Sequence, residues 1–190
     1  WPLNSGDLAG LTVTPAADSG EDFQLTVTAT STEADGGDMA VQTATIDVSV
    51  ASQADAPTVE TSAASGMEDG GPIGLDIDVD AASQDVQGEV VSVTISGVPE
   101  GATLSAGTYN EATGDWTVDA ADVDGLSVSL PEDFDEDFSL QVSATAQETD
   151  PDTGAVTTAT STPVGLDVSV GAVADAPTVT AENAAGTEDG

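Results

Sequence analysis

The chain has 190 residues, of which 38% are hydrophobic, so it can bury the core of one or two modest domains. It contains 36 Asp and Glu residues but no Lys, Arg or His, which gives a formal net charge of −36 at pH 7. This charge excludes nucleic acid and anionic membranes as partners, because both bind basic surfaces. Cys is also absent, and no apolar run approaches the ~20 residues of a membrane-spanning helix, so we expect neither disulfides nor membrane insertion in this segment.

An internal repeat organises the chain. The hexapeptide Ala-Asp-Ala-Pro-Thr-Val occupies residues 54–59 and returns at residues 174–179, 120 positions later. A fixed period of this size is typical of tandem domains. We therefore predict the C-terminal part of one repeat at 1–57, a complete repeat at 58–177, and the first strand and turn of a third repeat at 178–190.

The first two repeats also match upstream of their linkers, at an offset of 115. Trp1 matches Trp116 and Phe23 matches Phe138 at this spacing. Five extra residues around Pro163 in the second copy account for the change to 120. Both Trp residues are expected at the edge of a core, and both Phe residues on the inward side of a strand.

Apolar and polar residues alternate throughout the complete repeat, in which Val, Ile and Thr are frequent. This pattern is typical of half-buried strands, and Gly, Pro and Asp clusters between them indicate turns. The pattern predicts seven strands, at residues 58–61, 73–80, 90–96, 115–118, 125–130, 138–146 and 156–170. Seven short strands in about 120 residues is the number in an immunoglobulin-like sandwich. The predicted fold is therefore all-β, with tandem immunoglobulin-like β-sandwiches joined by short acidic linkers.

If neighbouring strands alternate in direction, the loops sort the acidic residues into two poles of the repeat. The upper pole, beside the preceding repeat, is predicted to carry Asp78, Asp80, Asp85, Glu89, Asp150 and Asp152. The lower pole is predicted to carry Glu68, Asp69, Asp133, Asp135 and Asp175. The end of the preceding repeat contributes Asp18, Glu21 and Asp22, and its linker contributes Asp55. Two acidic poles therefore face each other across Asp55.

Crowded carboxylates with no cationic side chain need a counter-ion, and these residues favour Ca²⁺. Ca²⁺ takes about six to eight oxygen ligands and tolerates irregular geometry. Transition metals lack the His or Cys that would favour them, and Mg²⁺ prefers to keep its water. Each cluster could also be a plain solvated turn, and none has the full spacing of an EF-hand loop. We predict that the pole and linker carboxylates bind Ca²⁺ between repeats.

An enzyme is the other class of protein to consider, and we do not expect one. A glycosidase needs only two carboxylates, one of them in an apolar pocket. Aromatic residues that could stack on sugar make up only 3% of the chain, and no cationic side chain is present to stabilise an anionic intermediate.

Several motifs of the complete repeat form a recognisable set. They are Gly-x-Glu-Asp-Gly at 66–70, Ile-Ser-Gly-Val-Pro-Glu-Gly-Ala-Thr-Leu at 95–104, Gly-Asp-Trp-Thr-Val at 114–118, Asp-Phe-Ser-Leu at 137–140 and the Ala-Asp-Ala-Pro linker. Together they resemble the immunoglobulin-like, cadherin-like extender repeats of giant RTX-type bacterial adhesins. The Glu that follows the linker proline by eleven residues is also similar to cadherins, in which such residues bind interdomain Ca²⁺.

The resemblance implies a structural extender, or stalk, of a large adhesin on the bacterial cell surface. Such a protein would be secreted unfolded by a type I system, and would project an adhesion domain for attachment or biofilm formation. Ca²⁺ between repeats would stiffen the stalk, and its partners would be neighbouring repeats of the same chain. The alternative is a Ca²⁺-dependent surface-layer or extracellular filament subunit, in which like chains associate.

Overall fold

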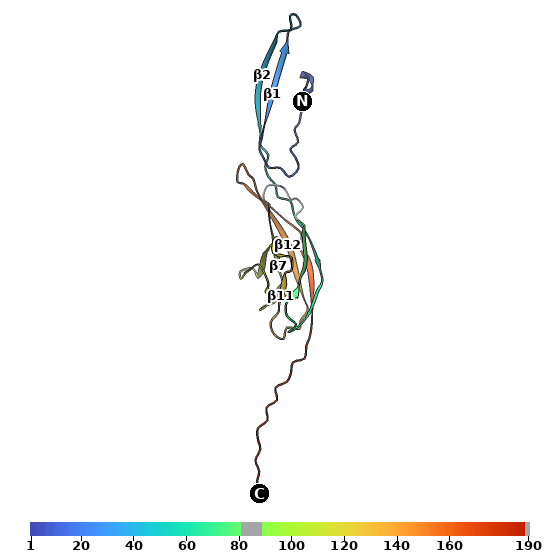
Figure 1. Cartoon of the computed structure of the whole chain (residues 1–190), viewed down its shortest axis with the longest axis vertical. Coiled ribbons are helices and arrows are strands. Elements are labelled where there is room, and N and C mark those ends of the chain that lie inside the picture. The colour runs from blue at the N-terminus through green and yellow to red at the C-terminus, as the bar shows by residue number, and fades with distance from the viewer. Residues whose placement is uncertain (81–88, 189–190) are drawn as a thin grey trace.

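The computed structural model describes residues 1–80 and 89–188, and nearly all regular structure within them is β. The expectation of an all-β protein is confirmed. The molecule is elongated, with a hairpin of β1 and β2 at one end and an extended C-terminal segment at the other (Figure 1). The described residues also contain two short 3₁₀ turns: η1 (Ser5–Asp7) precedes the first strand, and η2 (Ala120–Asp122) lies between β10 and β11. Among the described residues, no helix has the length and apolar character needed to cross a membrane.

Residues 1–57, here called the first unit, contain one hairpin. The strands β1 (Phe23–Thr32) and β2 (Met39–Val48) pair antiparallel along their whole length and form a sheet of their own. Neither strand contains a buried side chain, and even Leu25 and Ile46 are 36% and 50% exposed. The described part of the first unit therefore has a hairpin without a second sheet packed over its apolar side chains.

Strands β3 to β14, here called the strand body, form three sheets. The largest sheet has the order β4 (Ala64–Met67), β14 (Val164–Gly171), β12 (Phe138–Thr149), β7 (Val90–Ser96), β10 (Asp115–Asp119) and β9 (Thr108–Asn110), with β13 (Val156–Thr160) also paired to β12. The second has the order β5 (Ile73–Gly74), β11 (Ser127–Ser129) and β8 (Thr103–Leu104). The third pairs β3 (Thr58–Ser62) with β6 (Asp76–Asp80).

One hydrophobic core joins the three sheets. Ile95 and Val142 of the largest sheet, Val128 of the second and Ile77 of the third all belong to a single buried cluster. On β12, residues 140 to 149 alternate between buried and more exposed positions, as the period-two pattern predicts. Each fully buried aliphatic side chain contributes about 1.5–3 kcal/mol. The arrangement is consistent with a β-sandwich, and its core lies entirely within the strand body.

Most predicted strands appear in the structure, but two of them are divided. The strand predicted at 73–80 becomes β5 and β6, which join different sheets. The strand predicted at 156–170 is broken at residues 161–163, where Pro163 has no N–H to donate to a ladder. Strands β8 and β9 were not predicted, because segments of two or three residues are too short to show a period of two.

The two Trp residues have different environments. Trp116 is half-buried, packs against the core, and has its ring centroid 5.6 Å from that of Tyr109. The expectation that Trp1 lies at a core edge is wrong, since this side chain is fully exposed. The physical reason is that the described part of the first unit has no core against which Trp1 could pack.

Leu140 and Leu25 occupy matching positions, 115 residues apart, and allow a direct test of this difference. Leu140 is fully buried whereas Leu25 is 36% exposed. We expect Leu140→Ala to lower the free energy of unfolding by about 2–5 kcal/mol, and Leu25→Ala to change it by no more than ~0.5 kcal/mol. Urea unfolding followed by Trp116 fluorescence, in a Trp1→Phe background, measures both. Equal losses would contradict the difference in packing.

Candidate metal centres

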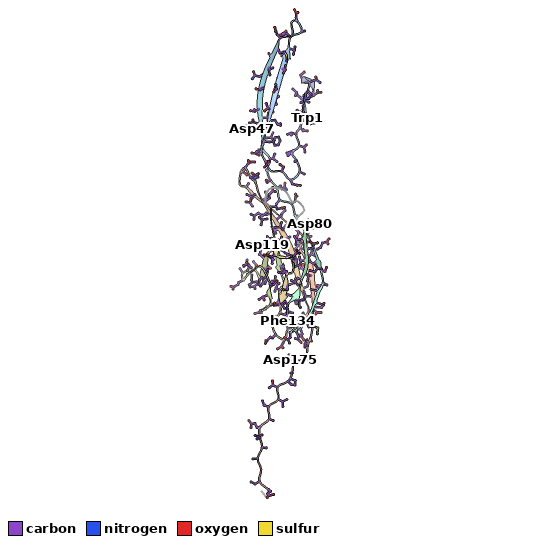
Figure 2. The ribbon with its side chains drawn as sticks, viewed as in Figure 1. Trp1, Asp47, Asp80, Asp119, Phe134 and Asp175 are labelled. Carbon is purple, nitrogen blue, oxygen red and sulfur yellow. The ribbon has the colours of Figure 1, made fainter. Side chains whose placement is uncertain are left out.

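Three carboxylates meet at the lower end of the strand body, the end nearer the C-terminus. Asp69 follows β4, Asp133 precedes β12, and Asp175 lies in the second linker (residues 172–177). Their carboxylate oxygens lie within 4.8 Å of one another. Two oxygens that each bind one Ca²⁺ at about 2.4 Å can be at most ~4.8 Å apart, so this spacing fits a shared ion. Figure 2 shows Asp175 at this lower end.

Local backbone conformation helps to position two of these carboxylates. Asp69 and Asp133 have positive φ angles of 58° and 59°, and Asp18 in the first unit has one of 56°. The left-handed region disfavours most side chains but is tolerated by Asp and Asn, whose short polar groups can hydrogen-bond locally. These turns therefore combine a tight reversal of the chain with a carboxylate at its apex.

Glu68 ties the second linker to this turn. Its side chain is buried, and its Oε1 accepts a hydrogen bond of 2.5 Å from the Val173 backbone N–H. The Glu68 backbone N–H in turn donates to the Gly171 carbonyl at 3.0 Å. Glu68 therefore holds the start of the linker next to Asp69. The Glu68 carboxylate accepts a backbone hydrogen bond and does not belong to the cluster of Asp69, Asp133 and Asp175.

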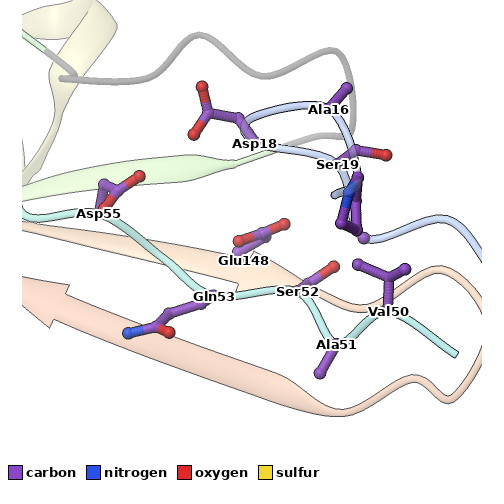
Figure 3. A pocket seen from close by; sticks show the side chains of 11 residues that line it. Ala16, Asp18, Ser19, Val50, Ala51, Ser52, Gln53, Asp55 and Glu148 are labelled. Atoms are coloured by element: carbon purple, nitrogen blue, oxygen red, sulfur yellow. The ribbon is translucent and has the colours of Figure 1, made fainter. Parts of the chain in front are cut away.

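A second acidic group lies at the upper end, between the first unit and β12. Asp18, Asp55 and Glu148 line one cavity of about 420 Å³ (Figure 3). Glu148 is only 3% exposed, and in this view its carboxylate lies below Asp18 and to the right of Asp55. A buried carboxylate needs a proton, hydrogen bonds or a cation, because desolvation penalises its charge. No Lys, Arg or His exists in the chain to supply that positive charge.

Glu148 was missed by the sequence analysis, although a signal for it exists. Glu33 occupies the matching position 115 residues earlier, and Asp35 likewise matches Asp150. A Glu-x-Asp motif therefore recurs where each repeat turns between its last two predicted strands. The alternation of β12 alone would have suggested an apolar residue at position 148, since Val142, Ala144 and Ala146 precede it on the same face.

The Asp150 side chain organises the turn between β12 and β13. Its Oδ1 accepts hydrogen bonds from the Thr153 hydroxyl, the Thr153 N–H and the Asp152 N–H at 2.7, 2.8 and 3.2 Å. Its Oδ2 accepts one from the Ser52 N–H in the first linker (residues 50–57) at 3.1 Å. These donors, the Thr153 hydroxyl first, lower the pKa of Asp150 to about 2 despite the opposing effect of burial.

The neighbouring aspartates extend this contact. Asp152 Oδ2 accepts a hydrogen bond from the Asp22 N–H at 2.8 Å, and Asp22 Oδ1 accepts one from the Val50 N–H, also at 2.8 Å. The predicted upper pole therefore does lie beside the first unit at Asp150 and Asp152.

The other predicted site residues fall outside both groups. Asp78 and Asp80 lie on β6 and are exposed, opposite Glu60 and Thr58 of β3. Glu21 and Asp135 are also exposed, whereas Glu89 is half-buried just before β7. Asp85 lies outside the described residues.

The lowered pKa of Asp150 predicts a pH dependence. A carboxyl group with a folded-state pKa of about 2, against an ordinary value of 3.8, adds stability that is fully present above about pH 4. This contribution is lost as the pH falls through about 2. Other carboxyls titrate in the same range, so the quantity to measure is the difference in urea midpoint between the wild type and Asp150→Asn. We expect a difference at pH 7 that disappears near pH 2, and a constant difference would contradict the assignment.

Comparison with known proteins gives no match from which a function could be inferred, so the two carboxylate groups are the main evidence for function. No protein-family model matches the chain, and no curated protein or solved structure matches it either.

Proposed function

We propose that this chain is an extender segment built from tandem immunoglobulin-like repeats, with Ca²⁺ bound at the junctions between them. One observation carries the proposal. Asp18 and Asp55 line the upper cavity, and their repeat counterparts Asp133 and Asp175 belong to the lower cluster. The same two positions of the repeat therefore contribute to a carboxylate group at both ends of the strand body.

Recurring local structure supports the tandem arrangement. The turns η1 and η2 lie 115 residues apart, and Gly10 and Gly125, at the same spacing, have φ angles of 80° and 77°. The hydrogen bond from the Val50 N–H to Asp22 Oδ1 also has a counterpart, from the Val170 N–H to Asp137 Oδ1, and both measure 2.8 Å. A shared backbone path through both units explains why local conformation and hydrogen bonding recur together.

The donor set fits Ca²⁺ better than other common cations. Each group offers carboxylate oxygens, which are hard ligands, and the chain contains no His or Cys to select a transition metal. The upper group takes Asp18 and Asp55 from the first unit and its linker, and Glu148 from the following strand body. Ca²⁺ would supply the positive charge that the chain lacks, and would join acidic surfaces that otherwise repel each other.

The physiological role follows from this charge arrangement. Separate domains joined by a few residues move independently by default, and an ion shared between them removes part of that freedom. Ca²⁺ is scarce in the cytoplasm and abundant outside cells, so the chain would stay loose during export and stiffen afterwards. We therefore place the segment in the stalk of a secreted bacterial surface adhesin, between the cell and an adhesion domain used for attachment or biofilm formation.

Calcium should raise the thermal stability of this chain. A ligand that binds only the folded state stabilises it by mass action, by about 2.7 kcal/mol at a free concentration 100 times its Kd. We expect the melting midpoint to rise clearly between excess chelator and millimolar Ca²⁺. Mg²⁺ at the same concentration should have a smaller effect. A midpoint that does not change with Ca²⁺ would rule out the proposed ion.

Two substitutions test the assignment of the linker residues. Asp55→Asn and Asp175→Asn should each weaken calcium binding measured by calorimetry, because each removes one carboxylate from one group. Glu111→Gln removes an equal charge from an exposed position and should leave the affinity unchanged. If the double variant binds Ca²⁺ as tightly as the wild type, the ion is held elsewhere.

One feature favours the alternative of a self-assembling layer or filament. Phe23, Leu25, Val27, Ile46 and Val48 share one face of the β1–β2 hairpin, and in this structure none of them is buried. An uncovered apolar face of this kind is a common site of association. Sedimentation in Ca²⁺ distinguishes the two functions: reversible growth into large assemblies supports the filament, whereas a monomer supports the stalk.

A further inference from the structure

We propose that the end of the β12–β13 hairpin (residues 148–157) is a docking clamp that holds the first unit against the strand body without any cation. This proposal concerns contacts that differ from the Ca²⁺ sites and does not depend on them. In Figure 1 this end of the hairpin, drawn in orange-brown, reaches up to the base of the β1–β2 hairpin.

Hydrogen bonds between described residues cross from the first unit to the hairpin. The backbone N–H groups of Asp22, Ser52 and Ala54 donate to Asp152 Oδ2 at 2.8 Å, Asp150 Oδ2 at 3.1 Å and Thr157 Oγ1 at 2.9 Å, in that order. All three donors are backbone amides, so they are present whatever ions surround the protein. Two of the acceptors are carboxylates, and hydrogen bonds to charged groups are stronger than those between neutral groups.

The first linker has the form of an extended strand seated on the hairpin. Ser52 and Ala54 are buried, whereas Ala51 and Gln53 are exposed. The Ser52 side chain lies against Gly20 of the first unit, while its backbone amide donates to the hairpin. The same alternation sends the Ser52 and Ala54 amides to acceptors on that hairpin. The second linker has no hairpin beside it in this structure, and its residues 172–177 are all exposed. Ser52 is therefore enclosed between Gly20 of its own unit and the hairpin, and contact with the hairpin accounts for part of the linker's burial.

Both sides of the contact are organised in advance. Thr153 donates two hydrogen bonds to Asp150 Oδ1, which leaves Oδ2 directed toward the Ser52 amide. On the other side, the hydrogen bond between Asp22 and the Val50 N–H joins the turn of the first unit to its linker. Groups that are already ordered lose less entropy when they dock.

The clamp and the proposed cation site use different atoms. A carboxylate offers about four acceptor positions, and Asp150 uses its own for four N–H and O–H donors. Asp18, Asp55 and Glu148 instead line the neighbouring cavity. A cation there would add a second attachment beside the clamp. The two units would therefore remain docked when the cation is removed.

Amide hydrogen exchange in excess chelator tests this directly. In the wild type we expect the Ser52 amide to exchange roughly 10- to 100-fold more slowly than in the variant Asp150→Ala/Asp152→Ala, the factor that corresponds to one hydrogen bond to a charged group. The Val142 amide, inside the core strand β12, should stay protected in both proteins and report that the strand body is folded. Glu111→Gln is the charge-loss control and should behave as the wild type.

Two results would overturn the clamp. The first is a Ser52 amide that is unprotected in wild-type protein with chelator while Val142 remains protected. The second is protection that appears only with Ca²⁺ and is equal in the wild type and the double variant. If the double variant does not fold, Asp152→Ala alone provides the test, with the Asp22 amide as the probe. This substitution keeps the backbone N–H of residue 152, which donates to Asp150 Oδ1, so the turn is retained. The first outcome is measured in chelator, so it tests the clamp separately from the proposed Ca²⁺ sites.

Discussion

The whole structure depends on one electrostatic constraint, which is that 36 acidic residues have no Lys, Arg or His to neutralise them. Exposed charges are screened beyond roughly 10 Å at 0.1 M salt, so acids spread over a surface cost little. Acids brought together at the end of a domain cost much more. Each buried or crowded carboxylate must therefore find backbone amides, hydroxyls, a proton or an external cation.

The fold uses backbone donors for several of these carboxylates. Glu68 accepts from the Val173 N–H, Asp137 from the Val170 N–H, and Asp150 from Ser52, Asp152 and Thr153. Each of these contacts fixes a linker or a turn, so the charge that destabilises the compact state also determines how its segments are held. The lower cluster of Asp69, Asp133 and Asp175 has carboxylate oxygens close enough to share a metal ion, and we propose a cation at the upper cavity as well.

Together with the proposed cation, the backbone contacts would give the junction two kinds of attachment. The amide contacts at Asp150 and Asp152 are part of the chain and set the relative position of the first unit and the strand body. A cation near Asp18, Asp55 and Glu148 would act as an environmental signal, because its binding depends on the surrounding concentration. In the proposed stalk, the amide contacts would hold neighbouring repeats together once they have folded, and the cation would stiffen the junction further outside the cell.

The sequence by itself determined the all-β class, most strand positions and the acidic character of the domain ends. Those features depend on local alternation and on turn residues, which are written in consecutive positions. It also placed Asp69, Asp133 and Asp175 at one pole, because strand direction follows from strand order.

Only the tertiary structure decided that the carboxylates of Asp69, Asp133 and Asp175 meet, that Glu148 is buried, and that Asp150 accepts a hydrogen bond from a linker amide 98 residues away. Such contacts depend on how distant segments pack, and side chains at the same repeat position, such as Leu25 and Leu140, differ because only one of them has a second sheet above it.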